Sequence, residues 1–526
     1  MFERYASPNE QRTISREDLG FYKAVVIAAI YDVPEDVDVD LTSLHSFVEP
    51  LRHCVLDQPY LSVVVKDKHT DKASYEKVPS LDLSKHISIL HDQKTSAETE
   101  NKTIERILLP ILDRPWPADI PPWRIVALPL APGTDNDNKS KSSTKRYLIA
   151  FSFSHALGDG ISGLIFHRAF LNAWNNAITR RSPTSPAEQS FLVSSSPQPL
   201  PQPFDTPSRL PISWSFLLSP LLAALLPNWV NSIFGLRASS SPRDKGTWTG
   251  SRMFFDPAIR DSSRLRLLEI QAPLLQQALS VARRRGVKFT GVLHQLIVAA
   301  LGRALMKEKG LDLNEEGITN LVSGTAINMR SSIGVENSEW GLFVSGDYAV
   351  HPIHPPPTDI EETGAGTEKA HSSLIITEDS WTSAHNITTS LASTSVRLKD
   401  QAIGLLRYAP SIRSWTASHV GGQRDCSYRV SNLLVFDGNP RDESEEGNSI
   451  SIIKTIFATS ADVTGSPLAF DIVSTRGGSL VIALGWQAGA LGLVSRERAL
   501  SEVDEVEGGF VGGVLESVER GFEALR

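Results

Sequence analysis

The stretch Tyr147-Leu148-Ile149-Ala150-Phe151-Ser152-Phe153-Ser154-His155-Ala156-Leu157-Gly158-Asp159-Gly160 decides how this chain is expected to fold. Its first part is a largely apolar run that follows a polar stretch, which predicts a buried strand. Beyond Gly160, apolar residues recur at helical spacing, namely Leu164, Ile165, Ala169, Phe170 and Trp174. His155 is therefore expected in the turn from a strand into a helix, where a rigid element can hold its ring accurately.

The residue types in this turn suit proton transfer. An alcohol is a poor nucleophile until its proton is being removed, and a neutral imidazole with a pKa near ~6.5 can accept that proton. Asp159 is expected to face away from the substrate and to hold the turn through an arginine, with Arg330 as the first candidate. Gly158 and Gly160 either let the chain bend sharply or let a ligand approach the backbone, and both readings stay open.

Other catalytic patterns do not occur in the sequence. It contains no Gly-x-Ser-x-Gly elbow, no phosphate-binding Gly-x-x-x-x-Gly-Lys-Ser/Thr loop and no His-Glu-x-x-His. His351 and His354 lie in a Pro-rich stretch without a nearby cysteine, and His294 lies in an apolar helical pattern where packing is expected. We therefore expect no metal site.

Strands and helices alternate along the rest of the chain. Apolar runs predict strands at 19–31, 61–66, 123–128, 147–154, 265–270, 320–329, 428–436, 451–458, 468–474 and 480–486. The strands at 123–128 and 147–154 are expected to pair as a hairpin. Helices are predicted over 41–56, after Gly160, and twice after residue 270, the second from a Thr290 cap. This order predicts a mixed α/β (α+β) fold without a short-period repeat.

Serine and proline crowd residues 182–211, a composition typical of linkers and crossover segments. We therefore divide the chain into an N-terminal half at 1–181, a crossover at 182–246 and a C-terminal half at 247–526. Within the crossover, residues 214–234 are apolar, but prolines and polar residues interrupt the run, which argues against a full membrane span. A buried or lid-like helix is the first expectation, and peripheral contact with an intracellular membrane is the second.

Bulk composition excludes several classes of protein. The net charge of −8 provides no broad basic surface, so nucleic-acid binding is not expected. Cys54 and Cys426 are the only cysteines, too few for a disulfide framework. Because the residues before Asp18 are polar and lack the apolar core of a secretory signal, we expect a cytoplasmic protein.

The stretch 154–160 resembles the HxxxDG signature of the superfamily that contains chloramphenicol acetyltransferase, plant BAHD acyltransferases and peptide-synthetase condensation domains. Further segments resemble the fungal alcohol acetyltransferase family, at 3–5 with 19–22, 122–126, 326–330 and 430–433. The Asp-Phe-Gly-Trp-Gly loop of the plant branch does not occur, and Leu484-Gly485-Trp486 only echoes it. Plant-type substrates are therefore not implied.

The resemblance implies two chloramphenicol-acetyltransferase-like halves, each a mixed sheet flanked by helices, with a tunnel between them. Acyl-CoA would enter from one face and the acceptor from the other. His155 would act in the tunnel, with Asp159 orienting the motif through Arg330. The residues expected to contact substrate are Gly160, Ser431 and Asn432, the last two near the thioester oxygen.

The expected activity is acyl-CoA-dependent O-acyl transfer, with acetyl transfer to an alcohol or a secondary-metabolite hydroxyl as the leading form. We expect no permanently bound cofactor, acetyl-CoA or another acyl-CoA as co-substrate, and a monomeric protein. Three alternatives remain open: N-acetylation of a small amine, an inactive ligand-binding relative, and a membrane-tethered lipid acyltransferase that uses residues 214–234.

Overall fold

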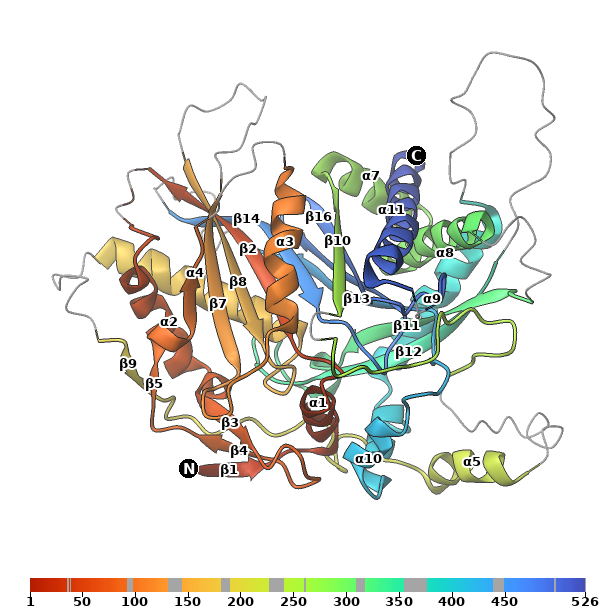
Figure 1. The fold of residues 1–526 in the computed structure, drawn as a ribbon, viewed down its shortest axis with the longest axis horizontal. Helices are drawn as coiled ribbons and strands as arrows, with labels where there is room; N and C mark the ends of the chain where they lie inside the picture. Colours follow the sequence, from red (N-terminus) through yellow and green to blue (C-terminus); the bar gives the residue numbers. More distant parts are fainter. Residues whose placement is uncertain are drawn as a thin grey trace, which may run out of the picture.

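The protein consists of two lobes that lie side by side (Figure 1). The computed structural model describes residues 1–35, 37, 39–91, 98–130, 144–180, 190–226, 241–259, 262–308, 317–353, 376–438, 449–495 and 498–525. His354 lies outside these residues.

Helices and strands alternate as the sequence predicted. The helices are α1 Pro8–Asp18, α2 Val48–Asp57, α3 Glu100–Asp113, α4 Gly160–Arg180, α5 Trp214–Leu225, α7 Ala272–Arg284, α8 Phe289–Glu308, α9 Glu378–Val396, α10 Ile412–Ala417 and α11 Leu500–Ala524. The strands are β1 Phe2–Tyr5, β2 Val25–Pro34, β3 Val63–Lys66, β4 Ser74–Lys77, β5 Ser80–Asp82, β6 Ile87–Ile89, β7 Trp123–Leu130, β8 Thr144–Phe153, β9 Leu192–Ser194, β10 Ser263–Ile270, β11 Asn320–Asn328, β12 Val344–Pro352, β13 Tyr428–Phe436, β14 Ser451–Thr459, β15 Leu468–Thr475 and β16 Leu480–Gln487.

The N-terminal lobe is built on a five-stranded sheet in the order β14-β2-β8-β7-β6. Strands β7 and β8 pair antiparallel, which confirms the expected hairpin. Strand β14 comes from far along the chain, and in Figure 1 its blue arrow lies beside the red and orange strands. The C-terminal part of the chain therefore supplies an edge strand to the N-terminal sheet.

Strand β2 is buried on both faces, which explains its unbroken apolar sequence. Val25, Ile27 and Ala29 pack in a core that also contains side chains of α2 and α4. The alternate residues Val26 and Ala28 pack with side chains of α3. Because side chains alternate along a strand, the sheet that carries the His155 turn is fixed by cores on both sides.

The C-terminal lobe is built on a six-stranded sheet in the order β10-β16-β15-β13-β11-β12. Side chains of α7, α8, α9 and α11 form its main core. Among the described residues, α8 is the one helix long and apolar enough to cross a membrane, but 67% of its apolar window is buried inside the protein. Its apolar sequence is thus explained by its place in the lobe's core.

The structure differs from the sequence predictions at several ends of elements. The strand predicted from residue 19 begins at Val25, because residues 8–18 form helix α1. The helix predicted over 41–56 begins at Val48, after a short 3-10 turn at Leu44–Phe47. Helix α8 begins at Phe289, so Thr290 is not its cap.

Helix α5 is the main departure. We expected a buried or lid-like helix, and the buried alternative is wrong for Trp214, Leu218 and Leu222, which are exposed, although Ala223 is buried. Residues 227–234 of the same segment lie outside the described residues.

Candidate active site

The end of β8 delivers His155 into a tightly held turn. The backbone N–H of Ser154 donates to the carbonyl of Pro122 at 2.8 Å, which continues the pairing with β7. The hydroxyl of Tyr75 donates to the carbonyl of Ala156 at 2.6 Å. Both partners come from rigid parts of the N-terminal lobe, so the position of His155 is set by the sheet.

Among the described residues, the imidazole of His155 has a hydrogen-bond partner for one nitrogen and none for the other. Nδ1 lies 2.8 Å from the carbonyl oxygen of Gly158. Since a carbonyl only accepts, Nδ1 carries the proton and Nε2 has the lone pair in the neutral ring. The ring is half-buried, 5.5 Å from the ring of Tyr22 between centroids, and so keeps some accessible surface.

Burial lowers the pKa of His155 to about 4, and the nearby guanidinium groups of Arg16 and Arg12 add to this effect. The hydrogen bond to Gly158 and the charge of Asp159 oppose it without reversing it. The ring is therefore neutral at cellular pH, which is the state that can accept a proton.

Asp159 faces away from His155 and caps helix α4. Its Oδ1 accepts the backbone N–H of Ser162 at 3.1 Å, the third residue of the helix, which is N-cap geometry. Its Oδ2 accepts the backbone N–H of Phe343 at 3.0 Å. Both oxygens also accept from Arg330, at 2.8 and 2.9 Å, so the sequence correctly predicted which arginine contacts Asp159.

The pair of Asp159 and Arg330 is fully buried, with 1% and 0% of the side chains exposed. Burial alone raises the pKa of a carboxyl, but Arg330 and the backbone donors hold the pKa of Asp159 below its usual value. Arg330 also donates to the carbonyl of Glu339 at 2.9 Å. The pair therefore ties the N-terminal lobe's turn to a loop of the C-terminal lobe.

That loop, residues 339–343, clasps the turn, and the sequence analysis missed it. The indole N–H of Trp340 donates to the carbonyl of Leu157 at 2.7 Å. The backbone N–H of Asp159 donates to the carbonyl of Gly341 at 3.1 Å. The sequence signal for this loop was the pair Trp340-Gly341. This pair does not indicate which segment the loop contacts.

Both glycines of the turn are sites of close packing. A Cβ on Gly158 would lie 2.6 Å from the hydroxyl oxygen of Ser162, and one on Gly160 would lie 2.8 Å from a methyl carbon of Leu433. This packing accounts for the two glycines without a ligand. Substrate contact by Gly160 stays a prediction.

Ser431 and Asn432 lie on β13, next to the Leu433 side chain that packs on Gly160. Asn432 is engaged in local structure: its amide donates to Thr290 at 3.3 Å and its oxygen accepts from Leu434 N at 2.9 Å. Leu434 has a positive φ of 64° at a bulge in the strand, which this second bond supports. Ser431 shares a strand face with Arg429, two residues earlier.

Helix α1 brings a group of polar side chains to His155 that the sequence analysis did not identify. Arg16 lies over the ring of Tyr22, with 4.7 Å from its guanidinium carbon to the ring centroid, and pairs with Asp462 of the C-terminal lobe. Glu17 accepts from the hydroxyl of Ser154. The capping box of Ser7 and Glu10 was the available signal for this helix.

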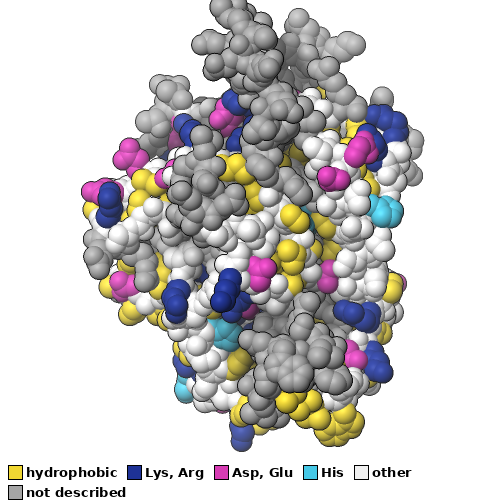
Figure 2. All heavy atoms as spheres, turned by 90° about the vertical axis from the view of Figure 1, so that its right-hand side faces the viewer, with side chains coloured by type: hydrophobic (Ala, Val, Ile, Leu, Met, Phe, Trp, Pro, Cys, Tyr) yellow, Lys and Arg dark blue, Asp and Glu magenta, His cyan; other side chains and the backbone are white. Residues whose placement is uncertain are grey.

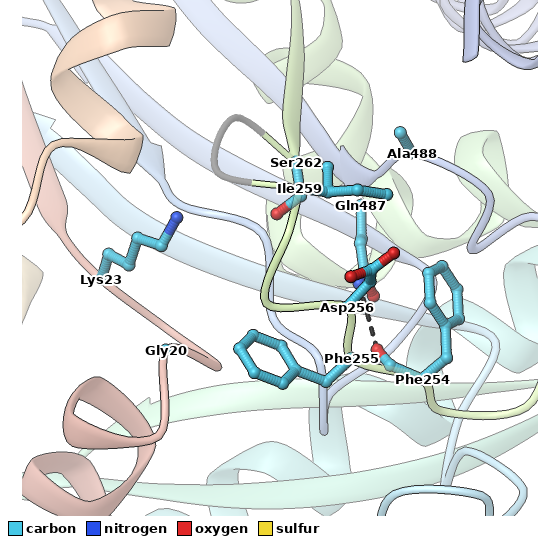
Figure 3. Close-up of a pocket in the computed structure, with 9 residues that line it drawn as sticks. All are labelled: Gly20, Lys23, Phe254, Phe255, Asp256, Ile259, Ser262, Gln487 and Ala488. Atoms are coloured by element: carbon cyan, nitrogen blue, oxygen red, sulfur yellow. Dashed lines mark hydrogen bonds between the residues drawn. The ribbon is translucent and has the colours of Figure 1, made fainter.

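Two cavities lie near these elements. The first, of about 20 Å³, separates Gly20 and Lys23 from Phe255 and Asp256 of the C-terminal lobe (Figure 3), which is room for about one water molecule. The second, of about 190 Å³, is lined by Glu17 and by residues 65–69 and 116–118, among others. The expected tunnel between the lobes stays a prediction.

His294 and His351 are packed inside the C-terminal lobe. His294 is buried, with its ring nitrogens 3.0 Å from the hydroxyl oxygens of Tyr428 and Thr325. His351 lies 2.8 Å from the hydroxyl of Ser323. No group of three or more His, Cys, Asp or Glu side chains that could hold a metal occurs among the residues that the structure describes.

No protein-family model matches the chain. Two relatives match it over nearly full length and are named probable alcohol acetyltransferases. One, crmB of Aspergillus fumigatus, is 21% identical and covers 98% of both chains. The other, FCK4 of Fusarium pseudograminearum, is 22% identical and covers 96% of this chain and 92% of its own.

Solved structures share the fold. The trichothecene 15-O-acetyltransferase TRI3 of Fusarium sporotrichioides superposes with a TM-score of 0.59 at 12% identity, over 99% of this chain and 98% of its own. TRI101 of F. sporotrichioides, solved with coenzyme A and T-2, gives a TM-score of 0.51 at 11% identity, over 95% and 99%. These comparisons confirm the resemblance to the fungal alcohol acetyltransferases and the two-lobed fold, and the chain is an acyltransferase.

Proposed function

We propose that the protein transfers an acyl group, acetyl in the leading form, from a CoA thioester to an alcohol, with His155 as the general base. One observation carries the proposal: His155 is neutral and partly accessible, and its Nδ1 is held by Gly158 O so that the lone pair of Nε2 is available. The relatives named alcohol acetyltransferases and the neighbour solved with coenzyme A support the choice of substrates.

The proposed reaction balances without a cofactor. Nε2 of His155 takes the proton of the alcohol as its oxygen attacks the thioester carbon. The tetrahedral intermediate then collapses, the C–S bond breaks, and the imidazolium returns the proton to the CoA thiolate. Asp159 takes no part in proton transfer, because both of its oxygens are occupied by Arg330 and backbone donors.

The intermediate carries negative charge on the former thioester oxygen, and a donor must stabilise it. Of the two residues predicted for this role, Ser431 is the better candidate. The side chain of Asn432 already forms hydrogen bonds with Thr290 and Leu434. Ser431 lies on the same strand face as Arg429, and the side chain of Arg429 interacts with Tyr22.

The test is replacement of His155 by alanine. We expect release of free CoA thiol from acetyl-CoA, measured across a panel of alcohols, to fall about 10²- to 10⁴-fold while the fold is retained. His53→Ala on the exposed side of α2 serves as the matched control. Near-normal thiol release by the His155 variant would refute the assignment.

The same panel separates the alternatives. Turnover of small amines but not alcohols would make the protein an N-acetyltransferase. Binding of acetyl-CoA in a calorimeter without turnover of any acceptor would identify an inactive ligand-binding relative.

We also propose that α5 makes peripheral contact with an intracellular membrane surface from the cytoplasmic side. Trp214, Leu218 and Leu222 recur at a spacing of four on one helix face, with 77%, 42% and 42% of their surface exposed. No charged residue occurs from Ile212 to Leu236. Figure 2 looks onto the side of the molecule where α5 lies, and hydrophobic side chains gather at its lower edge.

A vesicle assay tests this contact. The double variant Trp214→Ser with Leu218→Ser is expected to reduce the fraction that sediments with phospholipid vesicles by about half or more, because it removes apolar surface that lipid would bury. Leu192→Ser, which removes another exposed leucine on β9, should change nothing. Equal sedimentation of all three proteins would contradict the proposal.

A further inference from the structure

Arg12 stands apart from three other arginines with buried or partly buried guanidinium groups, Arg16, Arg424 and Arg429. Arg16 pairs with Asp462, and Arg429 pairs with Asp471 at 3.2 Å. Arg424 donates to backbone carbonyls, the shortest at 2.9 Å to Gly465. Within the described parts of the chain, Arg12 has neither a hydrogen bond nor an ion pair, and its Nε is fully buried without a partner.

Arg12 lies in the space where the two lobes meet. It is on α1, one helical turn before Arg16 and on the same face, and α1 lies at the junction of the lobes in Figure 1. Its electrostatic neighbours include Asp462 and Tyr348 of the C-terminal lobe. It also lies near enough to His155 to lower the pKa of that ring.

A guanidinium in these surroundings is costly without a counter-charge. Burial lowers the pKa of Arg12 to about 10, and Arg16 adds to this effect. Two carboxylates act on Arg12 through space without pairing with it. Asp462 pairs with Arg16, and Asp205 accepts the backbone N–H of Asn9 at 2.8 Å through Oδ2, while its buried Oδ1 has no hydrogen-bond partner among the described residues. The fold therefore holds a positive charge near His155 that forms no ion pair with the described residues.

We infer that Arg12 binds an oxyanion group of a substrate, a carboxylate or a phosphate, in the channel beside His155. A guanidinium matches such a group with two parallel hydrogen bonds, and the unpaired state of Arg12 leaves its donors free for them. This inference rests on the proposed acyl transfer, since it assigns a binding group to the same site. The group belongs either to acyl-CoA or to an acceptor that carries a carboxylate.

Thermal unfolding tests the unpaired charge without any need for turnover. In chloride buffer, Arg12→Met should unfold about 1–2 °C above the wild type, because it removes an uncompensated charge. Succinate or inorganic phosphate, at matched ionic strength, should raise the unfolding temperature of the wild type and leave that of the variant unchanged. Arg283→Met, which replaces an exposed arginine on α7, should behave as the wild type.

Two results overturn the inference. In one, Arg12→Met and Arg12→Gln both unfold below the wild type or fail to fold, because Arg12 then serves the fold. In the other, the anions stabilise the wild type and Arg12→Met equally. Neither result depends on the His155→Ala assay. Failure of the anion-binding inference can therefore be distinguished from failure of the proposed acyl transfer.

The source of the oxyanion follows from two further measurements. If it is a phosphate of CoA, Arg12→Met should weaken CoA binding in a calorimeter by about tenfold or more. If the acceptor carries it, CoA affinity should stay within about twofold, and the preference for hydroxy acids over their methyl esters should fall about tenfold. No change in either measurement overturns the inference.

Discussion

Asp159 and Arg12 are two enclosed charges that act on the pKa of the same histidine, His155, and their surroundings differ. Asp159 lies in a closed network in which Arg330 and two backbone N–H groups occupy its oxygens. Arg12 has no such partner among the described residues. The difference separates a charge that fixes the geometry of the site from one that is available to a ligand.

The two pKa shifts express the same contrast. For both groups, burial is the largest influence and opposes the charged form. At Asp159 the ion pair and hydrogen bonds outweigh it, so the pKa falls below the usual range of a carboxyl. At Arg12 nothing outweighs it, so the pKa falls to about 10. Partners, and not depth of burial, decide which charge is structural.

We call the network of Asp159 and Arg330 the closed side of the site, and the surroundings of Arg12, Arg16 and Glu17 the open side. Breaking the closed side should have the largest effect on stability. Asp159→Ala leaves the guanidinium of Arg330 buried and unpaired and removes the cap of α4, so we expect the free energy of unfolding to fall by about 3–5 kcal/mol. Urea denaturation followed by circular dichroism measures the loss.

A second substitution shows whether the buried charge is the cause. Asp159→Ala with Arg330→Met should recover part of the loss, because the orphaned charge is gone. A loss below about 1 kcal/mol for Asp159→Ala alone would mean that the pair does not hold the turn. Asp159→Asn provides a milder variant if the alanine variant does not fold.

The sequence predicted the pairing of Asp159 with Arg330 on the closed side, although it missed the loop at 339–343 that completes this network. Local pattern predicted the apolar run before His155 and the helical spacing after Gly160. The resemblance to known acyltransferases, together with the sequence, indicated Arg330 as the partner of Asp159. These features are determined by residues close in sequence or by a motif with a known geometry. They can therefore be predicted without knowledge of the whole fold.

The open side could not be predicted in the same way. Arg12, Arg16 and Glu17 lie on a helix with polar composition, and nothing in their spacing indicates that it packs between the lobes beside His155. Leu433 and Gly341 reach the turn from more than 170 residues away, at Gly160 and Asp159 respectively. Only the tertiary fold brings these groups together.

Glu17 offers a smaller, pH-dependent test of the open side. Burial raises the pKa of its carboxyl to about 7, and the hydrogen bond from the hydroxyl of Ser154 only partly offsets this rise. A carboxyl whose pKa is higher in the folded than in the unfolded protein contributes stability below its unfolded pKa, near ~4.3, and that contribution is lost as pH rises toward 7. Glutamine does not titrate, so between pH 5 and pH 8 the free energy of unfolding of Glu17→Gln should rise by about 1–2 kcal/mol relative to that of the wild type. This energy is discounted because Glu17 is partly exposed to solvent.

Urea denaturation at pH 5, 6.5 and 8 measures this change, with Glu505→Gln on the exposed face of α11 as the control. A difference between Glu17→Gln and wild type that does not vary with pH would show that Glu17 has an ordinary pKa. Asp159→Asn should show no such change over the same range, because the pKa of Asp159 lies below its usual value and the carboxylate stays ionised throughout. A pH-dependent difference for Glu17→Gln together with a pH-independent one for Asp159→Asn would show that Glu17 titrates between pH 5 and pH 8 and that Asp159 does not, even though the effect at Glu17 is smaller than the loss at Asp159→Ala.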